Sequence, residues 1–388
     1  MEWTVLGGGI GGMAAALSLT RAGAAVQVLE QAEAFSEVGA GVQLGPNVTR
    51  LLGEWGLHEA LMDVAFAPQR LQARDARSGR VLGDLNLAER VPARYGAPYV
   101  CIHRADLHSL LWRAVATMGA PVLQGARITE LQIEDDAVTL QAATGHRWRT
   151  QALLGADGLW SMSRRLLGLQ DTPRFSGHLA YRALVPQARL PAALRSDQVT
   201  VWMGPRLHVV EYPVQAGQTL NLVAIVHGDL PADPTGWDHE AQGAQLWQAM
   251  GAVCPLLQDR LRAVAKWRLW PLNDRKPLSG PHQMAQGRVA LLGDAAHPMR
   301  PYLAQGAGMA IEDAWVLGEC VTAAGELPQR LAAYAARRWA RNARVQARSV
   351  RNGRIFHARG PLAWGRNLAL AASGGQVMDV PWLYGGRP

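Results

Sequence analysis

The stretch Gly7-Gly8-Gly9-Ile10-Gly11-Gly12 decides how the amino-terminal part of this chain folds. A short apolar run, residues 1–6, precedes it and is typical of a buried strand, and residues 13–22 follow with a helical composition. A second strand is indicated at residues 25–30. A strand, a glycine turn, a helix and a second strand together predict a unit that binds a dinucleotide.

Three of these glycines and one acidic residue fill defined places in such a unit. Gly7, Gly9 and Gly12 match the G-x-G-x-x-G pattern. In that pattern glycine permits the tight turn, lets a pyrophosphate approach the backbone, and lets the helix pack closely on its strand. Glu30 ends the second strand, where a carboxylate accepts hydrogen bonds from a ribose and disfavours a 2′-phosphate. FAD and NAD both satisfy these requirements.

Length and composition favour a globular protein of about two domains. The chain has 388 residues, of which 49% are hydrophobic and 18% charged, an ordinary balance for a globular protein. We find no apolar run long enough to cross a membrane, and the first strand leaves no room for a leader, so we expect a cytoplasmic protein. The scattered cysteines Cys101, Cys254 and Cys320 predict buried thiols, with neither a disulfide framework nor a metal site.

The net charge of +8 invites the alternative of a nucleic-acid-binding protein. Much of the excess lies in Arg330–Arg354, where arginines recur at helical spacing without interleaved aromatic residues. This pattern predicts one solvated face of a long amphipathic helix and no nucleic-acid partner. The arginines on that expected face are Arg337, Arg338, Arg341, Arg344, Arg348 and Arg351.

The order of strand and helix patterns predicts an α/β fold into which a second, antiparallel sheet is inserted. The expected helices cover 49–55, 59–64, 106–118, 239–250, 255–264 and 306–320. The expected strands of the inserted part cover 71–77, 81–86, 181–185, 198–203, 208–212 and 220–226, with a turn around 231–236, and those returning to the first sheet cover 128–133, 137–142, 147–154 and 288–292. We therefore expect a discontinuous cofactor domain (1–70, 98–172 and 271–325), a substrate domain (71–97 and 173–270) and a C-terminal helical region (326–388).

Two further motifs follow the glycine turn in a fixed order. The first is Asp157-Gly158 with Ser161 and Arg164, and the second is Gly293-Asp294-Ala295-Ala296-His297-Pro298, followed by Pro301 and Gly306-Ala307-Gly308. With these motifs in this order, nearly the whole chain resembles the single-component FAD-dependent aromatic hydroxylases. This is the family of p-hydroxybenzoate and salicylate hydroxylases, and the nearest branches are the salicylate hydroxylases, the 3-hydroxybenzoate 6-hydroxylases and the 6-hydroxynicotinate 3-monooxygenases. The resemblance implies a Rossmann-type (GR2-like) FAD-binding domain, an inserted antiparallel-sheet domain and a long C-terminal helix.

The resemblance also implies which residues hold FAD. Arg104 reaches the cofactor, and Asp294 holds its ribityl and pyrophosphate region. Ala307 and Gly308 offer backbone N–H groups to the flavin ring at a helix start. Asp157 and Arg164 belong to a fingerprint associated with FAD and with the nicotinamide donor, whereas His297 is structural. The full expected cofactor set is Gly7, Gly9, Gly12, Glu30, Gly41, Val42, Arg104, Asp157, Arg164, Asp294, Pro301, Gly306, Ala307, Gly308 and Met309. Within it, Gly41 and Val42 lie in the glycine-rich loop 37–47, which lets backbone approach a flat ligand.

The implied reaction is a monooxygenation. NADH or NADPH binds transiently and reduces FAD, O2 gives a flavin C4a-hydroperoxide, and a small phenolic acid of the hydroxybenzoate or salicylate type is hydroxylated. A phenol has a pKa near 10, so a base is useful, and the alternation of residues 207–212 puts His208 and Tyr212 on one face of a strand. We expect His208 as base or substrate contact, Pro301 in the loop over the flavin, and substrate contacts from Gln43, His208, Tyr212, Tyr302 and Gln305.

Several alternatives stay open at this point. Pro301 stands where 3-hydroxybenzoate enzymes carry glutamine, and Gln43 where 6-hydroxynicotinate enzymes carry histidine, so neither branch matches throughout. The substrate is then a phenolic acid, a hydroxypyridine carboxylate or a bulkier aromatic, or the protein is a flavin reductase that does not insert oxygen. A basic binding protein that uses the arginine helix is the rival from another class. A monomer and a homodimer are equally compatible with the sequence.

Overall fold

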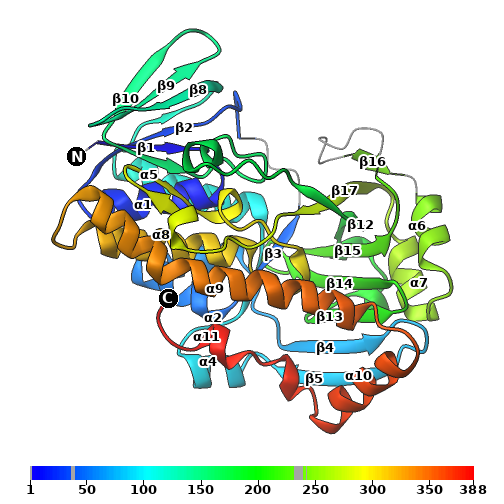
Figure 1. Cartoon of the computed structure of the whole chain (residues 1–388). Helices are drawn as coiled ribbons and strands as arrows, with labels where there is room; N and C mark the ends of the chain where they lie inside the picture. Colours follow the sequence, from blue (N-terminus) through cyan, green and yellow to red (C-terminus); the bar gives the residue numbers. More distant parts are fainter. Residues whose placement is uncertain (1, 36–39, 231–238, 242) are drawn as a thin grey trace.

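The computed structural model describes residues 2–35, 40–230, 239–241 and 243–388, and it contains two large sheets with a long helix beside both (Figure 1). The first sheet has the strand order β18-β19-β11-β1-β2-β7, parallel except for β18. Its apolar strands are covered by helices, as parallel sheets require. The strands are β1 (Glu2–Leu6), β2 (Ala25–Leu29), β7 (Val122–Leu123), β11 (Ala152–Gly155), β18 (Ala285–Gln286) and β19 (Val289–Leu291).

The glycine turn connects β1 to helix α1 (Ile10–Arg21) as the sequence predicts. Gly7 has φ +107°, a conformation that side chains rarely allow, and a Cβ on it would collide with the carbonyl oxygen of Ala156. A Cβ on Gly12 would collide with the carbonyl oxygen of Gly7. Two of the three motif glycines are therefore required by the packing of the turn itself.

The inserted sheet has eight strands in the order β16-β17-β12-β15-β14-β13-β4-β5, antiparallel except where β13 pairs with β4. This confirms the expected second sheet, and β4 and β5 form the hairpin expected around residues 78 and 79. One expectation is wrong in part: residues 239–241 form β16 on β17, so the helix expected over 239–250 begins only at Gly243. The turn expected at 231–236 lies outside the described residues. The strands are β4 (Arg70–Asp75), β5 (Val81–Asn86), β12 (Arg174–Pro186), β13 (Val199–Gly204), β14 (Leu207–Val214), β15 (Thr219–His227), β16 (His239–Ala241) and β17 (Trp267–Asp274).

Only some of the strands expected to return to the first sheet do return to it. Residues 128–150 form a separate three-stranded sheet, β10-β9-β8, whereas β11 and, later in the chain, β19 join the parallel sheet. All four residues of β11 are buried, whereas β8 is largely exposed along its length. A strand of the parallel sheet must be apolar on both faces, which β11 is and β8 is not. The separate strands are β8 (Ile128–Ile133), β9 (Val138–Ala142) and β10 (Arg147–Thr150).

The arginine-rich segment forms α9 (Leu327–Phe356), a 30-residue helix that runs along both parts of the molecule (Figure 1). The expectation of a single solvated arginine face is wrong, because Arg338 is fully buried against Glu312 and Asp313 of α8. Helical spacing could not reveal this, since the acidic partners lie on another helix. Part of the positive charge is therefore neutralised inside the protein.

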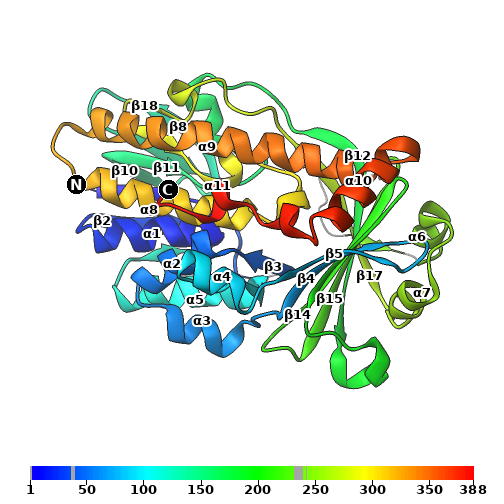
Figure 2. The same cartoon turned by 90° about the horizontal axis from the view of Figure 1, so that it is seen from below.

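Figure 2 shows α1, α2 and α5 on the side of the first sheet, away from the inserted sheet. No described helix combines the length and apolar character that crossing a membrane requires. The α-helices not yet given are α2 (Pro46–Glu54), α3 (His58–Val64), α4 (Arg90–Tyr95), α5 (Arg104–Thr117), α6 (Gly243–Met250), α7 (Pro255–Arg262), α8 (Gly306–Val321), α10 (Gly360–Ala372) and α11 (Pro381–Tyr384), and β3 (Gly41–Leu44) pairs with β6 (Val100–His103).

Candidate active site

A cavity of about 390 Å³ lies between the first sheet and one face of the inserted sheet. Residues that directly follow β1, β11 and β19 form one wall, and the start of α8 forms another. Ligands of open α/β sheets bind at this carboxyl edge of the parallel strands. The expected site residues that line the cavity are Gly9, Gly41, Val42, Gln43, Arg104, His208, Tyr212, Asp294, Pro301, Gln305, Gly306 and Ala307.

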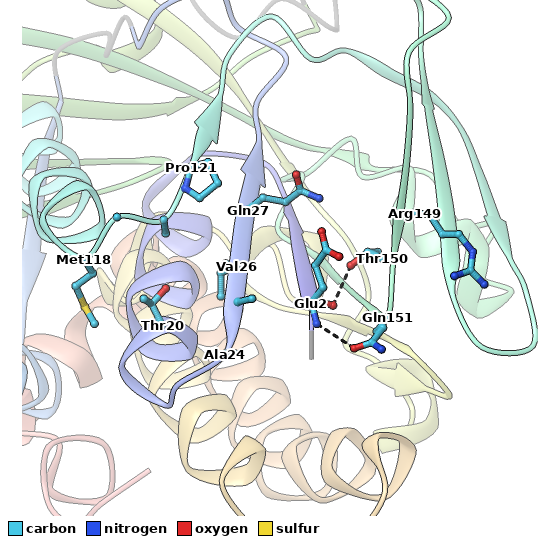
Figure 3. A pocket seen from close by; sticks show the side chains of 13 residues that line it. Glu2, Thr20, Ala24, Val26, Gln27, Met118, Pro121, Arg149, Thr150 and Gln151 are labelled. Carbon is cyan, nitrogen blue, oxygen red and sulfur yellow. Dashed lines mark hydrogen bonds between the residues drawn. The ribbon is translucent and has the colours of Figure 1, made fainter.

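A larger hollow at the other edge of the first sheet has no such features. It measures about 740 Å³ and lies where β1 and β2 begin, beside Glu2 and Ala25 (Figure 3). The hydrogen bonds drawn there join Glu2 to its neighbours: the Glu2 amide donates to Gln151 at 3.0 Å, and the Thr150 hydroxyl donates to the Glu2 carbonyl at 3.1 Å. None of the candidate site residues lines this hollow. The site is therefore the smaller cavity at the carboxyl edge.

The glycine turn is shaped to receive a phosphate group. Gly9 lines the cavity, and a Cβ built on it would meet no protein atom within 4 Å. Its missing side chain thus leaves open space at the amino terminus of α1, where backbone N–H groups and the helix dipole favour an anion. Glu30 lies beside the turn and accepts the Gly8 amide at 2.6 Å. These residues fit the adenosine and pyrophosphate part of FAD.

Asp294 faces the cavity from the turn after β19. Its side chain is exposed to the cavity, yet protein surrounds it closely enough that burial raises its pKa, while His297 and Arg104 act in the opposite direction. Arg104 lies at the first position of α5 and also lines the cavity. A carboxylate and a guanidinium in one cavity can bind the hydroxyl and phosphate groups of an extended cofactor.

Asp157 and Arg164 do not line the cavity, but they form hydrogen bonds to segments that surround it. The Asp157 carboxylate accepts the amides of Met162 and Ser163 at 2.8 and 3.0 Å. Buried Arg164 donates to the carbonyl of Ala295 at 2.8 Å, directly after Asp294. We infer that they position the cofactor residues. The other expected site residues that do not line the cavity are Gly7, Gly12, Glu30, Tyr302, Gly308 and Met309.

The inserted sheet presents alternate residues of β12, β15 and β14 to the cavity. Ala180, Ile225 and His208 form one row across these strands. The next row contains Arg182 of β12, a buried residue whose guanidinium lies over the ring of Trp270. Arg182 is not among the residues expected from the sequence, because only the register of β12 with β15 and β14 shows that it faces the cavity. The sheet thus brings a cation and an imidazole to one apolar surface.

His208 is buried and has a partner that the sequence did not indicate. Its Nδ1 lies 2.7 Å from Nε2 of His357, which follows the last residue of α9. Burial, with a smaller contribution from His178, lowers the pKa of His208 to about 3. A phenol has a pKa near 10, about seven units above that of His208. Transfer of the phenolic proton to His208 alone, with formation of an imidazolium ion, is therefore strongly unfavourable.

Other rings surround this pair. Nδ1 of His357 lies 3.1 Å from Nε2 of His227, and Nδ1 of His178 lies 2.5 Å from the Tyr302 hydroxyl. Burial is the main cause that lowers the pKa of His357, His227 and His178, the last to about 4. All these imidazoles are therefore neutral near pH 7.

His178, His227 and His357 each bring a ring nitrogen to within 4.8 Å of the others, a grouping that a divalent metal can use. Two observations speak against that use. The His227–His357 contact is already a hydrogen bond, and Arg206 and Arg359 lie close enough to His227 to lower its pKa. A divalent cation would meet this positive charge. We therefore interpret the group as a hydrogen-bonded cluster of neutral histidines.

Comparison with known proteins agrees with these features. The family described as FAD binding domain matches residues 1–349. The 3-hydroxybenzoate 6-hydroxylase of Polaromonas naphthalenivorans is 36% identical over 98% of this chain and 95% of its own length. The 6-hydroxynicotinate 3-monooxygenase of Bordetella bronchiseptica is 35% identical over 81% of this chain and 80% of its own.

Solved structures of other proteins share the overall fold of this chain. Klebsiella pneumoniae HpxO, complexed with FAD and uric acid, has a TM-score of 0.86 at 27% identity and covers 97% of this chain and 94% of its own. A salicylate hydroxylase in a substrate complex has a TM-score of 0.83 at 26% identity, with 99% and 95% covered.

Proposed function

Since this chain belongs to the FAD-binding-domain family and is a flavoprotein aromatic monooxygenase, we propose that it hydroxylates a small aromatic acid that carries a phenolic hydroxyl. NADH or NADPH would supply electrons, and O2 the inserted oxygen atom. One observation carries the choice of substrate: the buried guanidinium of Arg182 and the imidazole of His208 face the same cavity from one sheet.

The spacing of the two groups suits a benzene ring with an acidic group on one side. Arg182 and His208 lie on strands separated only by β15, in neighbouring rows of the same face. Their Cα atoms are then on the order of 10 Å apart, and both side chains reach inward. We place the substrate carboxylate at Arg182, where a planar guanidinium can bind it with two hydrogen bonds, and the hydroxyl at His208. Val210, Val223 and Ile225 would contact the ring faces.

FAD, when bound, supplies the electron-accepting and oxygen-transferring chemistry. The residues of this chain bind FAD, orient the substrate and exclude water from the cavity. Gly9 and Asp294 fit the two ends of the cofactor's phosphate and ribityl region, and Gly306 and Ala307 at the start of α8 fit the flavin ring. Pro301 and the inserted sheet close the cavity on the substrate side. A more electron-rich ring reacts faster, so loss of the phenolic proton near His208 is the step that the protein promotes.

A hydroxypyridine carboxylate is the second candidate substrate. A relative named for 6-hydroxynicotinate is 35% identical, and such a substrate also combines a carboxylate with an ionisable hydroxyl. Arg182 and His208 would serve both compounds. The two candidate substrates differ only in a ring nitrogen. Measured turnover of each compound is therefore needed to distinguish them.

A panel of hydroxybenzoates, 6-hydroxynicotinate and benzoate tests the proposal. We expect a hydroxylated acid to stimulate NADH or NADPH oxidation and to yield a product that has gained one oxygen atom from 18O2, whereas benzoate binds without product. Stimulated oxidation without labelled product would indicate a reductase and would overturn the proposal.

Variants at Arg182 test the orientation of the substrate. Arg182→Met should raise KM for the acid at least 10-fold while the matching amide is little affected, and Arg182→Lys should recover part of the loss. Equal effects on the acid and the amide would remove the carboxylate from Arg182.

A further inference from the structure

Three histidines form a continuous path from the cavity toward the surface. His208 lines the cavity and is 1% exposed, His357 is 8% exposed, and His227 is partly exposed. His208 Nδ1 lies 2.7 Å from His357 Nε2, and His357 Nδ1 lies 3.1 Å from His227 Nε2. Each contact joins the Nδ1 of one ring to the Nε2 of the next.

We propose that His208, His357 and His227 are a proton relay that carries the phenolic proton of the substrate from the buried cavity to water. The inference rests on the proposed function, because it requires a phenolic substrate at His208. It adds two residues that act through His208 and do not touch the substrate.

The relay balances as a series of single proton transfers. The phenolic O–H bond breaks, and the proton bonds to Nε2 of His208, while the hydrogen on His208 Nδ1 passes to Nε2 of His357. The hydrogen on His357 Nδ1 passes to Nε2 of His227, whose Nδ1 hydrogen passes to water. The result is one phenolate, one hydrated proton and three neutral rings, and the reverse sequence restores the starting tautomers when the phenol is protonated again.

The surroundings of the rings suit transfer and oppose storage of a proton. Burial disfavours the imidazolium form of all three rings, and at His227 the nearby Arg206 and Arg359 add to this effect. A proton that enters the path is therefore passed on. His208 alone would have to hold the charge in the buried cavity, so the path explains how a histidine with such a weak basicity can serve a phenol.

The fold holds the middle ring in place from both sides. The amide of His357 donates to the carbonyl of Gly353 at 3.1 Å, which fixes it at the end of α9. Its carbonyl accepts the amide of Arg206 at 3.3 Å, in the turn between β13 and β14 that leads directly into His208. The long helix thus places His357 within hydrogen-bond distance of His208 on β14 and of His227 on β15.

The test uses the FAD-bound oxidised protein without NADH or NADPH, so that no turnover occurs. The probe is the hydroxybenzoate with the lowest KM in the panel, mixed rapidly with protein in weakly buffered solution containing a pH-indicator dye. The dye reports proton release, and the absorbance of the bound ligand reports phenolate. In the unaltered protein both signals should appear together.

His357→Gln and His227→Gln are the informative variants, because glutamine can keep a hydrogen bond but cannot pass a proton from one end to the other. We expect each to slow proton release at least 10-fold with little change in ligand or FAD affinity. In His227→Ala, added imidazole should restore the rate in a concentration-dependent manner, because His227 is the partly exposed end of the path. His58→Gln, an exposed histidine in α3, is the control and should release protons at the unaltered rate.

Two results would overturn the relay. Proton release at the unaltered rate in both glutamine variants would show that His208 acts without the path. Stoichiometric tightly bound metal in the purified protein, lost in His227→Gln, would show that the ring nitrogens are ligands. Absence of phenolate in the unaltered protein together with absence of a hydroxylated product would instead count against the proposed function, so the two failures are distinguishable.

Discussion

The guanidinium of Arg338 on α9 lies 2.8 Å from the carboxylate of Asp313 on α8, and both side chains are fully buried. The same carboxylate accepts the Gly293 amide at 3.1 Å and contacts His297 Nε2 at 2.5 Å. Gly293 directly precedes Asp294, which faces the cofactor cavity. A pair of charges between two helices therefore holds the turn that presents Asp294.

Loss of Arg338 should destabilise the protein strongly. Arg338→Ala leaves Glu312 and Asp313 buried without their cation, and breaking such a pair costs about 3–5 kcal/mol of unfolding free energy. Urea unfolding of the apoprotein measures this loss. Arg337→Ala, which removes the neighbouring exposed arginine paired with Glu319, should change the value by less than about 1 kcal/mol. Equal effects of the two variants would contradict the buried pair.

Alanine at two glycines of the turn should separate folding from cofactor binding. Gly12→Ala brings its Cβ against the Gly7 carbonyl oxygen and should lower the melting temperature of the apoprotein. Gly9→Ala meets no protein atom within 4 Å and should melt normally, but its methyl group occupies the space for the pyrophosphate. We expect at least a 10-fold weaker FAD affinity for Gly9→Ala, measured by flavin fluorescence titration. Unchanged FAD affinity in Gly9→Ala would place the pyrophosphate elsewhere.

The neutral histidines predict that mild acid destabilises the fold. The pKa of His178 is lowered to about 4 and that of His208 to about 3, whereas an unfolded histidine has a pKa near 6.5. Between these values the unfolded chain binds more protons than the native protein, so stability falls as the pH drops below about 6.5. By pH 5 each of the two groups costs about 2 kcal/mol relative to pH 8.

Urea unfolding at pH 5, 6, 7 and 8 checks this sign. His178→Gln should flatten the decline between pH 7 and pH 5, whereas the exposed His58→Gln should leave it unchanged. A protein that became more stable on acidification over this range would show that the histidines are charged in the native state.

Local patterns in the sequence, together with the family resemblance, indicated residues that the structure brings to one cavity. The glycine turn, Asp294 and the residues after Gln305 lie next to recognisable strands and helix starts, and the structure brings Gly9, Asp294 and Ala307 to one cavity. The FAD-binding family match confirms the cofactor.

The substrate side depends on contacts between residues far apart in the chain. His208 and His357 are separated by 149 positions, and only the path of α9 brings them together. In the sequence, Arg338 cannot be distinguished from the exposed arginines of α9, because the carboxylates that pair with it are on α8. Arg182 lies in an apolar strand whose inward face becomes known only from the register with β15 and β14. Pattern alone cannot supply these pairings.

Asp294 should differ from Arg338 in its effect on stability. Arg338 stabilises the fold, whereas we expect Asp294 to favour FAD binding and to lower the stability of the apoprotein. Burial raises the pKa of its carboxyl, so the folded apoprotein holds this charge less favourably than the unfolded chain does. Asp294→Ala should therefore leave the urea midpoint of the apoprotein unchanged or higher, while FAD is lost on gel filtration. Asp63→Ala, at an exposed aspartate of α3, should retain both FAD and stability. An apoprotein that unfolded more readily after Asp294→Ala, or one that kept FAD, would show that the carboxylate serves the fold and that another group in the cavity binds the cofactor.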